Sequence, residues 1–126
     1  MIQGVFFDLD GTLADTAPDL GGALNRLLEQ QRRSPLPLAA LRPHVSGGAR
    51  ALLRVGFGIN PDDARYPDYL ERFLGIYQAH ICDESTLFEG MDDVLNALEA
   101  RHLPWGIVTN KAERFTLPLV ERLALA

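Results

Sequence analysis

The chain has little of what marks secreted and membrane-bound proteins. It contains one cysteine, Cys82, so an internal disulfide is excluded and a reducing cytoplasm is the expected compartment. No apolar run is long enough to span a bilayer, and the start Met1-Ile2-Gln3-Gly4 lacks the positive region and the cleavage site of a signal peptide. Internal repeats and low-complexity tracts are also absent. We therefore expect a soluble protein that does not contact a membrane.

Basic residues are outnumbered and never form a long run. The 12 Lys and Arg side chains stand against 17 Asp and Glu side chains, which gives a formal net charge of −5. The longest basic run is the pair Arg32-Arg33. Because such a surface does not attract the phosphates of nucleic acids, no nucleic-acid partner is expected. The length of 126 residues falls in the usual range of one domain.

An apolar run near the start ends in two carboxylates, in the string Val5-Phe6-Phe7-Asp8-Leu9-Asp10-Gly11-Thr12-Leu13. The run predicts a strand buried on both faces, and Asp8 then falls at its carboxyl end, where open parallel sheets bind ligands. Residues two apart in a strand share a face, so Asp8 and Asp10 converge and favour a divalent cation such as Mg²⁺ between them. With a glycine for close approach and the Thr12 hydroxyl as a donor, the pattern predicts phosphoryl transfer through an aspartyl-phosphate.

The middle of the chain reads as helical and its last third as α/β. Thr16-Ala17-Pro18-Asp19 has the form of a capping box with proline in the first turn, and opens a helix that runs to about Gln31. This helix carries Leu20, Leu24, Leu27 and Leu28, at the i, i+4, i+7, i+8 spacing of one apolar face. Further helices are expected over residues 38–41, 49–55, 67–81 and 116–123. Another is expected with Met91, Val94, Leu95 and Leu98 on one face, ended by His102-Leu103-Pro104. The helix over residues 116–123 begins at Thr116 because Pro118 fits only a first turn.

A second short apolar run, residues 105–109, predicts another strand. If it lies parallel and adjacent to the first strand, Thr109 and Asp8 face one cleft. The Thr109 hydroxyl and the backbone N–H groups of Asn110 and Lys111 would then bind phosphate oxygens. A simple strand-to-helix turn is the alternative for this segment, and a solvated lysine at the start of a helix is the alternative for Lys111.

The string from Asp8 to Thr16 resembles the first motif of the haloacid dehalogenase superfamily of phosphatases, and the strand ending in Thr109 resembles its second. The resemblance implies an α/β fold: a partial Rossmann-like core of parallel strands, residues 1–15 and 87–126, with an α-helical cap, residues 16–86, inserted. It also implies that Asp8 is the nucleophile and that Asp10 transfers protons, since the dehalogenases of the superfamily lack this second aspartate. Mg²⁺ would be held by Asp8 and by the main-chain carbonyl of Asp10, with Gly11 and Thr12 beside the phosphate.

The cap carries a string, Ser46-Gly47-Gly48-Ala49-Arg50, that resembles the specificity loop of such caps. Gly47 and Gly48 would permit close approach to the substrate, and Arg50 would pair with a substrate carboxylate. The alternative for Arg50 is an ordinary surface arginine. By resemblance, the substrate is a small phosphorylated metabolite, either 2-phosphoglycolate or a sugar acid phosphate such as N-acetylmuramate 6-phosphate. The residues from Val45 to Arg50 favour the latter, and a phosphomutase is the alternative activity.

The family's core normally continues beyond the point where this sequence stops. The lysine that neutralises the phosphate and the further aspartates of the Mg²⁺ site are not found. Asp92-Asp93 opens a helix and does not follow a strand, so it does not replace them. We therefore expect the N-terminal part of a longer phosphatase, with an open strand edge that favours self-association. An inactive fragment is the alternative.

Overall fold

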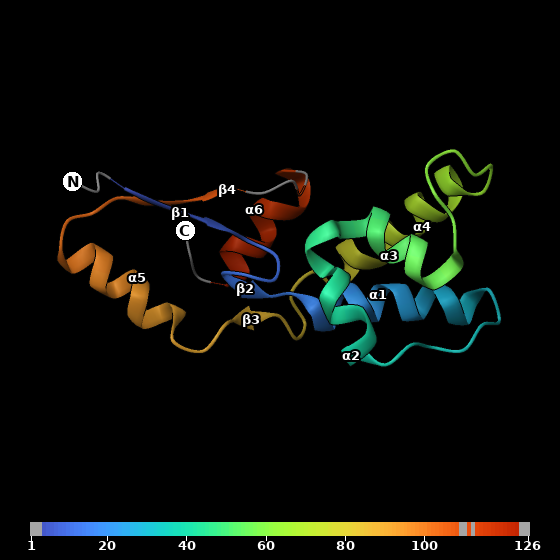
Figure 1. The fold of residues 1–126 in the computed structure, drawn as a ribbon, viewed down its shortest axis with the longest axis horizontal. Helices are drawn as coiled ribbons and strands as arrows, with labels where there is room; N and C mark the ends of the chain where they lie inside the picture. Colours follow the sequence, from blue (N-terminus) through green and yellow to red (C-terminus); the bar gives the residue numbers. More distant parts are fainter. Residues whose placement is uncertain (1–3, 109–110, 112, 124–126) are drawn as a thin grey trace.

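The computed structural model describes residues 4–108, 111 and 113–123, and these form two lobes (Figure 1). The core lobe holds β1 (Val5–Asp8), α5 (Met91–Ala100), β4 (Trp105–Val108) and α6 (Glu113–Arg122). The helical lobe holds α1 (Ala17–Gln30), α2 (Leu38–Leu41), the 3-10 helix η1 (Arg42–Gly47), α3 (Gly48–Phe57) and α4 (Tyr66–Ala79). The short strands β2 (Ala14–Asp15) and β3 (Thr86–Leu87) lie where the chain passes between the lobes. This arrangement agrees with the expected core and cap, while their division into separate domains stays a prediction.

The two longer strands pair in parallel, as predicted from the sequence. In their register Val5 lies opposite Trp105 and Asp8 lies opposite Val108. Parallel neighbours present their carboxyl ends at the same edge of a sheet, so the residues that follow β1 and β4 meet at one place. The crossover between the strands contains the whole helical lobe, which is why segments about 100 residues apart in sequence become neighbours.

The prediction that β1 is buried on both faces is wrong for the described part of the chain. The Phe6 side chain is 74 % exposed, and Gly106 opposite it offers no side chain to cover the ring. The other face is packed: Phe7 makes an edge-to-face contact with Trp105, with ring centroids 6.4 Å apart, and lies against the hydrophobic core. Burial within the described residues therefore accounts for the apolar side chains on only one face of β1.

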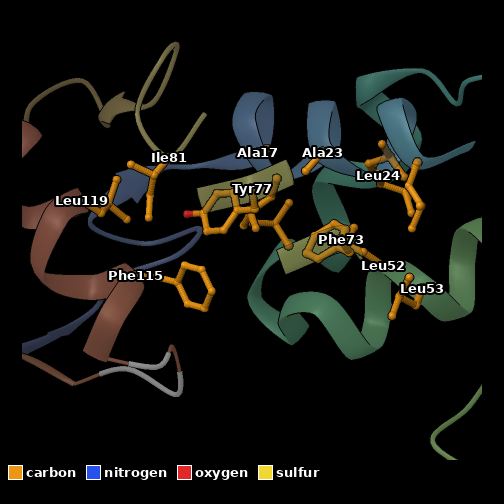
Figure 2. Close-up of a cluster of buried hydrophobic side chains, with 14 of the residues drawn as sticks. Ala17, Ala23, Leu24, Leu52, Leu53, Phe73, Tyr77, Ile81, Phe115 and Leu119 are labelled. Carbon is orange, nitrogen blue, oxygen red and sulfur yellow. The ribbon is translucent and has the colours of Figure 1, made fainter. Parts of the chain in front are cut away.

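One apolar cluster joins the two lobes (Figure 2). The spacing of leucines predicted for the first helix is confirmed, since Leu20, Leu24, Leu27 and Leu28 of α1 are all buried. Figure 2 shows the row continuing through Phe73 and Tyr77 of α4 to side chains of α6 in the core lobe. The lobes are thus held against each other by buried side chains.

The predicted capping box at the start of α1 does not form. The Thr16 side chain makes no capping hydrogen bond and instead donates to the Asp10 carboxylate. Asp19 is 3 % exposed and accepts hydrogen bonds from the backbone N–H groups of Glu84 and Ser85 and from the Ser85 hydroxyl. Neither side chain caps α1, because each takes part in a different contact. Thr16 is one of the donors to the Asp10 carboxylate, and Asp19 is a buried carboxylate that several donors stabilise more than one would.

The last helix begins three residues earlier than expected and contains Pro118 in its interior. Proline has no N–H to donate to the preceding turn, so the helix loses one hydrogen bond there. Phe115 and Leu119, one turn apart, are both buried in the cluster. Their burial from one helical face outweighs the lost bond, and Pro118 itself lies on the exposed side. Within the described residues, no helix is long and apolar enough to cross a membrane.

Candidate active site

A cavity of about 360 Å³ lies where the two lobes meet. Asp8 lines it from the end of β1 and Asp10 from the loop that follows, and Lys111 and Arg114 line it from the segment after β4. The helical lobe contributes the junction of η1 and α3, residues 46–49, and apolar side chains of α4, among them Phe73 and Tyr77. The cavity therefore combines charged groups at the strand ends with a mostly apolar cover.

A tight turn after β1 presents the first carboxylate to this cavity. Asp8 is exposed, and one of its carboxylate oxygens accepts a hydrogen bond of 3.0 Å from the backbone N–H of Leu9. Gly11 has φ +80°, a left-handed conformation that favours glycine, and its N–H donates to the Ala14 carbonyl to close the turn. A carboxylate that lines a cavity and stays exposed is placed to meet a ligand.

The second carboxylate is held more firmly. Oδ1 of Asp10 accepts a hydrogen bond of 2.7 Å from the Thr16 hydroxyl and lies 3.2 Å from Nζ of Lys111. The side chains of Asp10 and Lys111 are only 13 % and 8 % exposed. These contacts fix the Asp10 carboxylate in one orientation, so the two aspartates of the motif have different surroundings despite being two residues apart.

Lys111 connects the core lobe to the helical lobe. Its ammonium donates a hydrogen bond of 2.8 Å to the Tyr77 hydroxyl and lies 4.3 Å from the centre of the Tyr77 ring. Burial lowers the pKa of Lys111, and the charge of Asp10 opposes this by raising it. Burial raises the pKa of Tyr77, and the negative charges of Asp10 and Asp19 raise it further, so the phenol stays neutral at ordinary pH.

Tyr77 was not predicted as a site residue. Its position on the apolar face of α4 indicated only a core residue, and it is indeed buried. Its hydroxyl at the end of a buried ring was the one signal that a polar partner was needed, because a buried phenol usually finds one. The sequence does not show that this partner is a lysine 34 residues away.

The other predicted site residues are distributed unevenly. Ser46, Gly47 and Gly48 line the cavity, as expected for a loop that covers a ligand. Gly48 has φ +66°, and a Cβ added at Gly47 would lie 2.6 Å from Cβ of Ala51, so both positions favour glycine. Thr12 and Arg50 are exposed and do not line the cavity, whereas Arg114, which was not predicted, does.

Two of the predicted phosphate-binding residues, Thr109 and Asn110, lie outside the described residues. Within the described part of the chain, no group of three or more His, Cys, Asp or Glu side chains is placed to hold a metal ion. Asp8 and Asp10 still supply the carboxylate and carbonyl oxygens that a hard cation prefers, and Mg²⁺ is commonly bound by one or two carboxylates together with waters and substrate phosphates. These residues fit Mg²⁺ as part of a site.

Comparison with known proteins identifies the family. The sequence profile of the haloacid dehalogenase-like hydrolases matches residues 5–126. The chain belongs to this family. The match includes both strand ends that line the cavity and the helical lobe between them, so the resemblance predicted from the two motifs is confirmed.

Relatives in the family are named phosphatases. The chain is 43 % identical over 125 residues to a phosphoglycolate phosphatase of Caulobacter vibrioides, covering 97 % of this chain and 53 % of the relative. It is 38 % identical over 125 residues to an N-acetylmuramic acid 6-phosphate phosphatase of Pseudomonas aeruginosa, covering 99 % of this chain and 55 % of the relative. The chain thus spans about half the length of the curated relatives it matches.

Solved structures show the same fold. A crystal structure from Haemophilus somnus, titled a predicted phosphoglycolate phosphatase, matches with a TM-score of 0.81 and 22 % identity, covering 98 % of this chain and 58 % of that one. A family hydrolase from Deinococcus radiodurans, solved with bound phosphate and sodium, matches with a TM-score of 0.61 and 24 % identity, covering 99 % of this chain and 54 % of that one. The predicted α/β fold of this family, present in part, is confirmed.

Proposed function

We propose that this chain forms part of a Mg²⁺-dependent phosphomonoester hydrolase that acts through an aspartyl-phosphate. One observation carries the proposal: the ends of two parallel strands bring Asp8, Asp10 and Lys111 to a single cavity covered by the helical lobe. The family and its named phosphatases support the reaction class. A cytoplasmic location is part of the proposal, because the free thiol of Cys82 suits a reducing compartment.

The two aspartates have separate roles in the proposed reaction. A carboxylate oxygen of Asp8 attacks the phosphorus, the bond between phosphorus and the ester oxygen breaks, and Asp10 gives a proton to the leaving alcohol. Asp10 then takes a proton from the water that attacks the aspartyl-phosphate, which releases phosphate and restores Asp8. The exposure of Asp8 and the fixed orientation of Asp10 support this assignment.

Lys111 and the proposed metal would reduce the electrostatic repulsion between the site and its substrate. Asp8 is negative when it attacks, and a phosphomonoester brings further negative charge, so the approach needs compensation. Asp10 carries the proton for the leaving alcohol in this first step and becomes negative when it gives the proton up. The ammonium of Lys111 is 3.2 Å from Asp10 and supplies part of the compensation. Mg²⁺, held by the Asp8 carboxylate and the Asp10 main-chain carbonyl, would supply more. Thr109 and Asn110 remain proposed phosphate-binding residues.

The proposed substrate is a small phosphomonoester that also carries a carboxylate. Phosphoglycolate and N-acetylmuramic acid 6-phosphate, the compounds in the relatives' names, share this chemistry. The cavity of about 360 Å³ suits a small metabolite. Arg114, in the first turn of α6, lines the cavity, whereas Arg50, in the first turn of α3, does not.

The proposal is tested by assaying phosphate release with Mg²⁺ from a panel of phosphomonoesters. The protein is this chain extended to the length of its relatives, as wild type, Asp8→Asn and Asp62→Asn. Asp62 is an exposed loop aspartate and serves as the matched control. We expect Asp8→Asn to abolish turnover, Asp62→Asn to keep it, and a trapped phosphoryl group to map to residue 8. A covalent label on another residue would remove Asp8 as the nucleophile.

A further inference from the structure

We propose that Arg114 binds the carboxylate of the substrate and so selects carboxylated phosphomonoesters. The inference rests on the proposed function, since it concerns the same cavity. Arg114 lies in the first turn of α6 and lines the cavity together with Asp8 and Asp10. A ligand with its phosphoryl group at Asp8 is therefore in the same enclosure as this guanidinium.

The guanidinium of Arg114 lies over a buried ring. Its Cζ lies 4.6 Å from the centre of the Phe115 ring, and Phe115 is 3 % exposed and itself lines the cavity. A guanidinium over an aromatic face keeps its N–H donors available, because the ring attracts the positive charge and is not a carboxylate acceptor. That arrangement leaves a planar fork of donors that matches the two oxygens of a carboxylate.

The other cation of the cavity wall is already engaged. Lys111 contacts Asp10 and donates to the Tyr77 hydroxyl, and its side chain is 8 % exposed. Lys111 therefore acts on Asp10, the proposed acid/base residue. Arg114, in contrast, forms no ion pair with any carboxylate among the described side chains, whereas three other arginines each have one: Arg42 with Asp15, Arg65 with Asp63, and Arg72 with Asp68.

Arg50, the arginine predicted from the sequence, is less well placed. It is exposed and does not line the cavity, although the neighbouring Gly48 and Ala49 do. Arg50 and Arg114 thus have the same side chain and both are exposed, but only Arg114 lines the cavity. This makes Arg50 a matched control.

The experiment compares two ligands that differ in the carboxylate. The 126-residue chain is titrated with 2-phosphoglycolate and with ethyl phosphate, in Mg²⁺ and at millimolar ligand, and binding is followed by NMR chemical shifts. The proteins are wild type, Arg114→Gln, Arg114→Lys and Arg50→Gln. We expect Arg114→Gln to bind 2-phosphoglycolate about tenfold more weakly, because a charge-assisted hydrogen bond is lost, and to bind ethyl phosphate within about twofold of wild type. Arg114→Lys should fall between, and Arg50→Gln should match wild type.

Other outcomes would overturn the inference in distinguishable ways. Equal weakening of both ligands in Arg114→Gln would show general charge attraction, and selective weakening in Arg50→Gln would transfer the role to Arg50. Wild type binding both ligands equally would refute carboxylate recognition and leave the phosphatase proposal standing. If wild type binds neither ligand, the cavity of the 126-residue chain does not bind phosphomonoesters and the inference is refuted. Unchanged amide spectra away from the cavity show that each variant is folded.

Discussion

The Asp10 carboxylate depends on residues from three separate parts of the chain. Thr16 lies six residues further on, and Lys111 follows the second strand. Tyr77 of the helical lobe acts at one remove, since it accepts the hydrogen bond of Lys111. A residue of the helical lobe therefore contacts the partner of the proposed acid/base group, and displacement of that lobe would change the surroundings of Lys111.

The role of Asp10 gives a prediction at this scale. Asp10→Asn, made in the chain extended to the length of its relatives, should slow turnover by a factor of roughly 10²–10⁴, the usual contribution of a positioned proton-transfer group. The affinity for inorganic phosphate, measured as product inhibition, should be retained. Asp62→Asn is again the control. Hydrolysis at the wild-type rate in Asp10→Asn would exclude this residue from the mechanism.

At the scale of helices, close packing and one buried carboxylate hold the helical lobe. Asp19 at the start of α1 binds the segment at Glu84 and Ser85, where the chain returns toward the core lobe. Further along, α1 and α3 approach closely at Gly56. A Cβ added there would lie 2.8 Å from Cδ1 of Leu24, nearer than side-chain carbons normally come.

Two glycine substitutions test this packing. Gly56→Ala should destabilise the chain by about 1–3 kcal/mol, because the added methyl overpacks the contact with Leu24. Gly75→Ala is the matched control: Gly75 is exposed in α4 with no atom within 4 Å of an added Cβ, so the same change should stabilise by about 0.5–1 kcal/mol. Urea unfolding measures both. An equal increase in the free energy of unfolding in both variants would mean that α1 and α3 do not pack this closely.

The whole molecule presents an open strand pair. β1 and β4 pair only with each other among the described strands, and Phe6 is 74 % exposed on one face. Unpaired strand edges and exposed apolar side chains both favour association. Relatives nearly twice the length of this chain have further residues that are candidates to cover these surfaces.

We expect the 126-residue chain to be a poor phosphatase that self-associates. The chain and its extended form are compared for Mg²⁺-dependent turnover, because the extended form adds the charged groups that the family is expected to use. Sedimentation velocity measures association, which Phe6→Gln should reduce, while Leu117→Gln, at a 54 % exposed position on α6, should change it less. Comparable turnover by the short and extended chains would show that the added residues are not needed.

Local patterns in the sequence determined most of the elements and the two carboxylates of the site. The leucine spacing of α1 and the placement of Asp8 at a strand end depend on residues a few positions apart, which is why they could be predicted. The parallel pairing followed from the crossover of the chain. Even the family could be identified from the two motifs, because each occupies a short stretch.

Only the tertiary structure decided which distant side chains meet. Tyr77 and Lys111 are 34 residues apart, and Asp19 and Ser85 are 66 apart, so no local period relates them. Pro118 entered a helix interior because Phe115 and Leu119 are buried on the opposite side. Arg114 lines the cavity and Arg50 does not, although both are arginines near a helix start. Which side chains meet and which are buried depends on how the lobes pack. The free energy of that packing comes from contacts between distant segments, so no single segment of the sequence contains it.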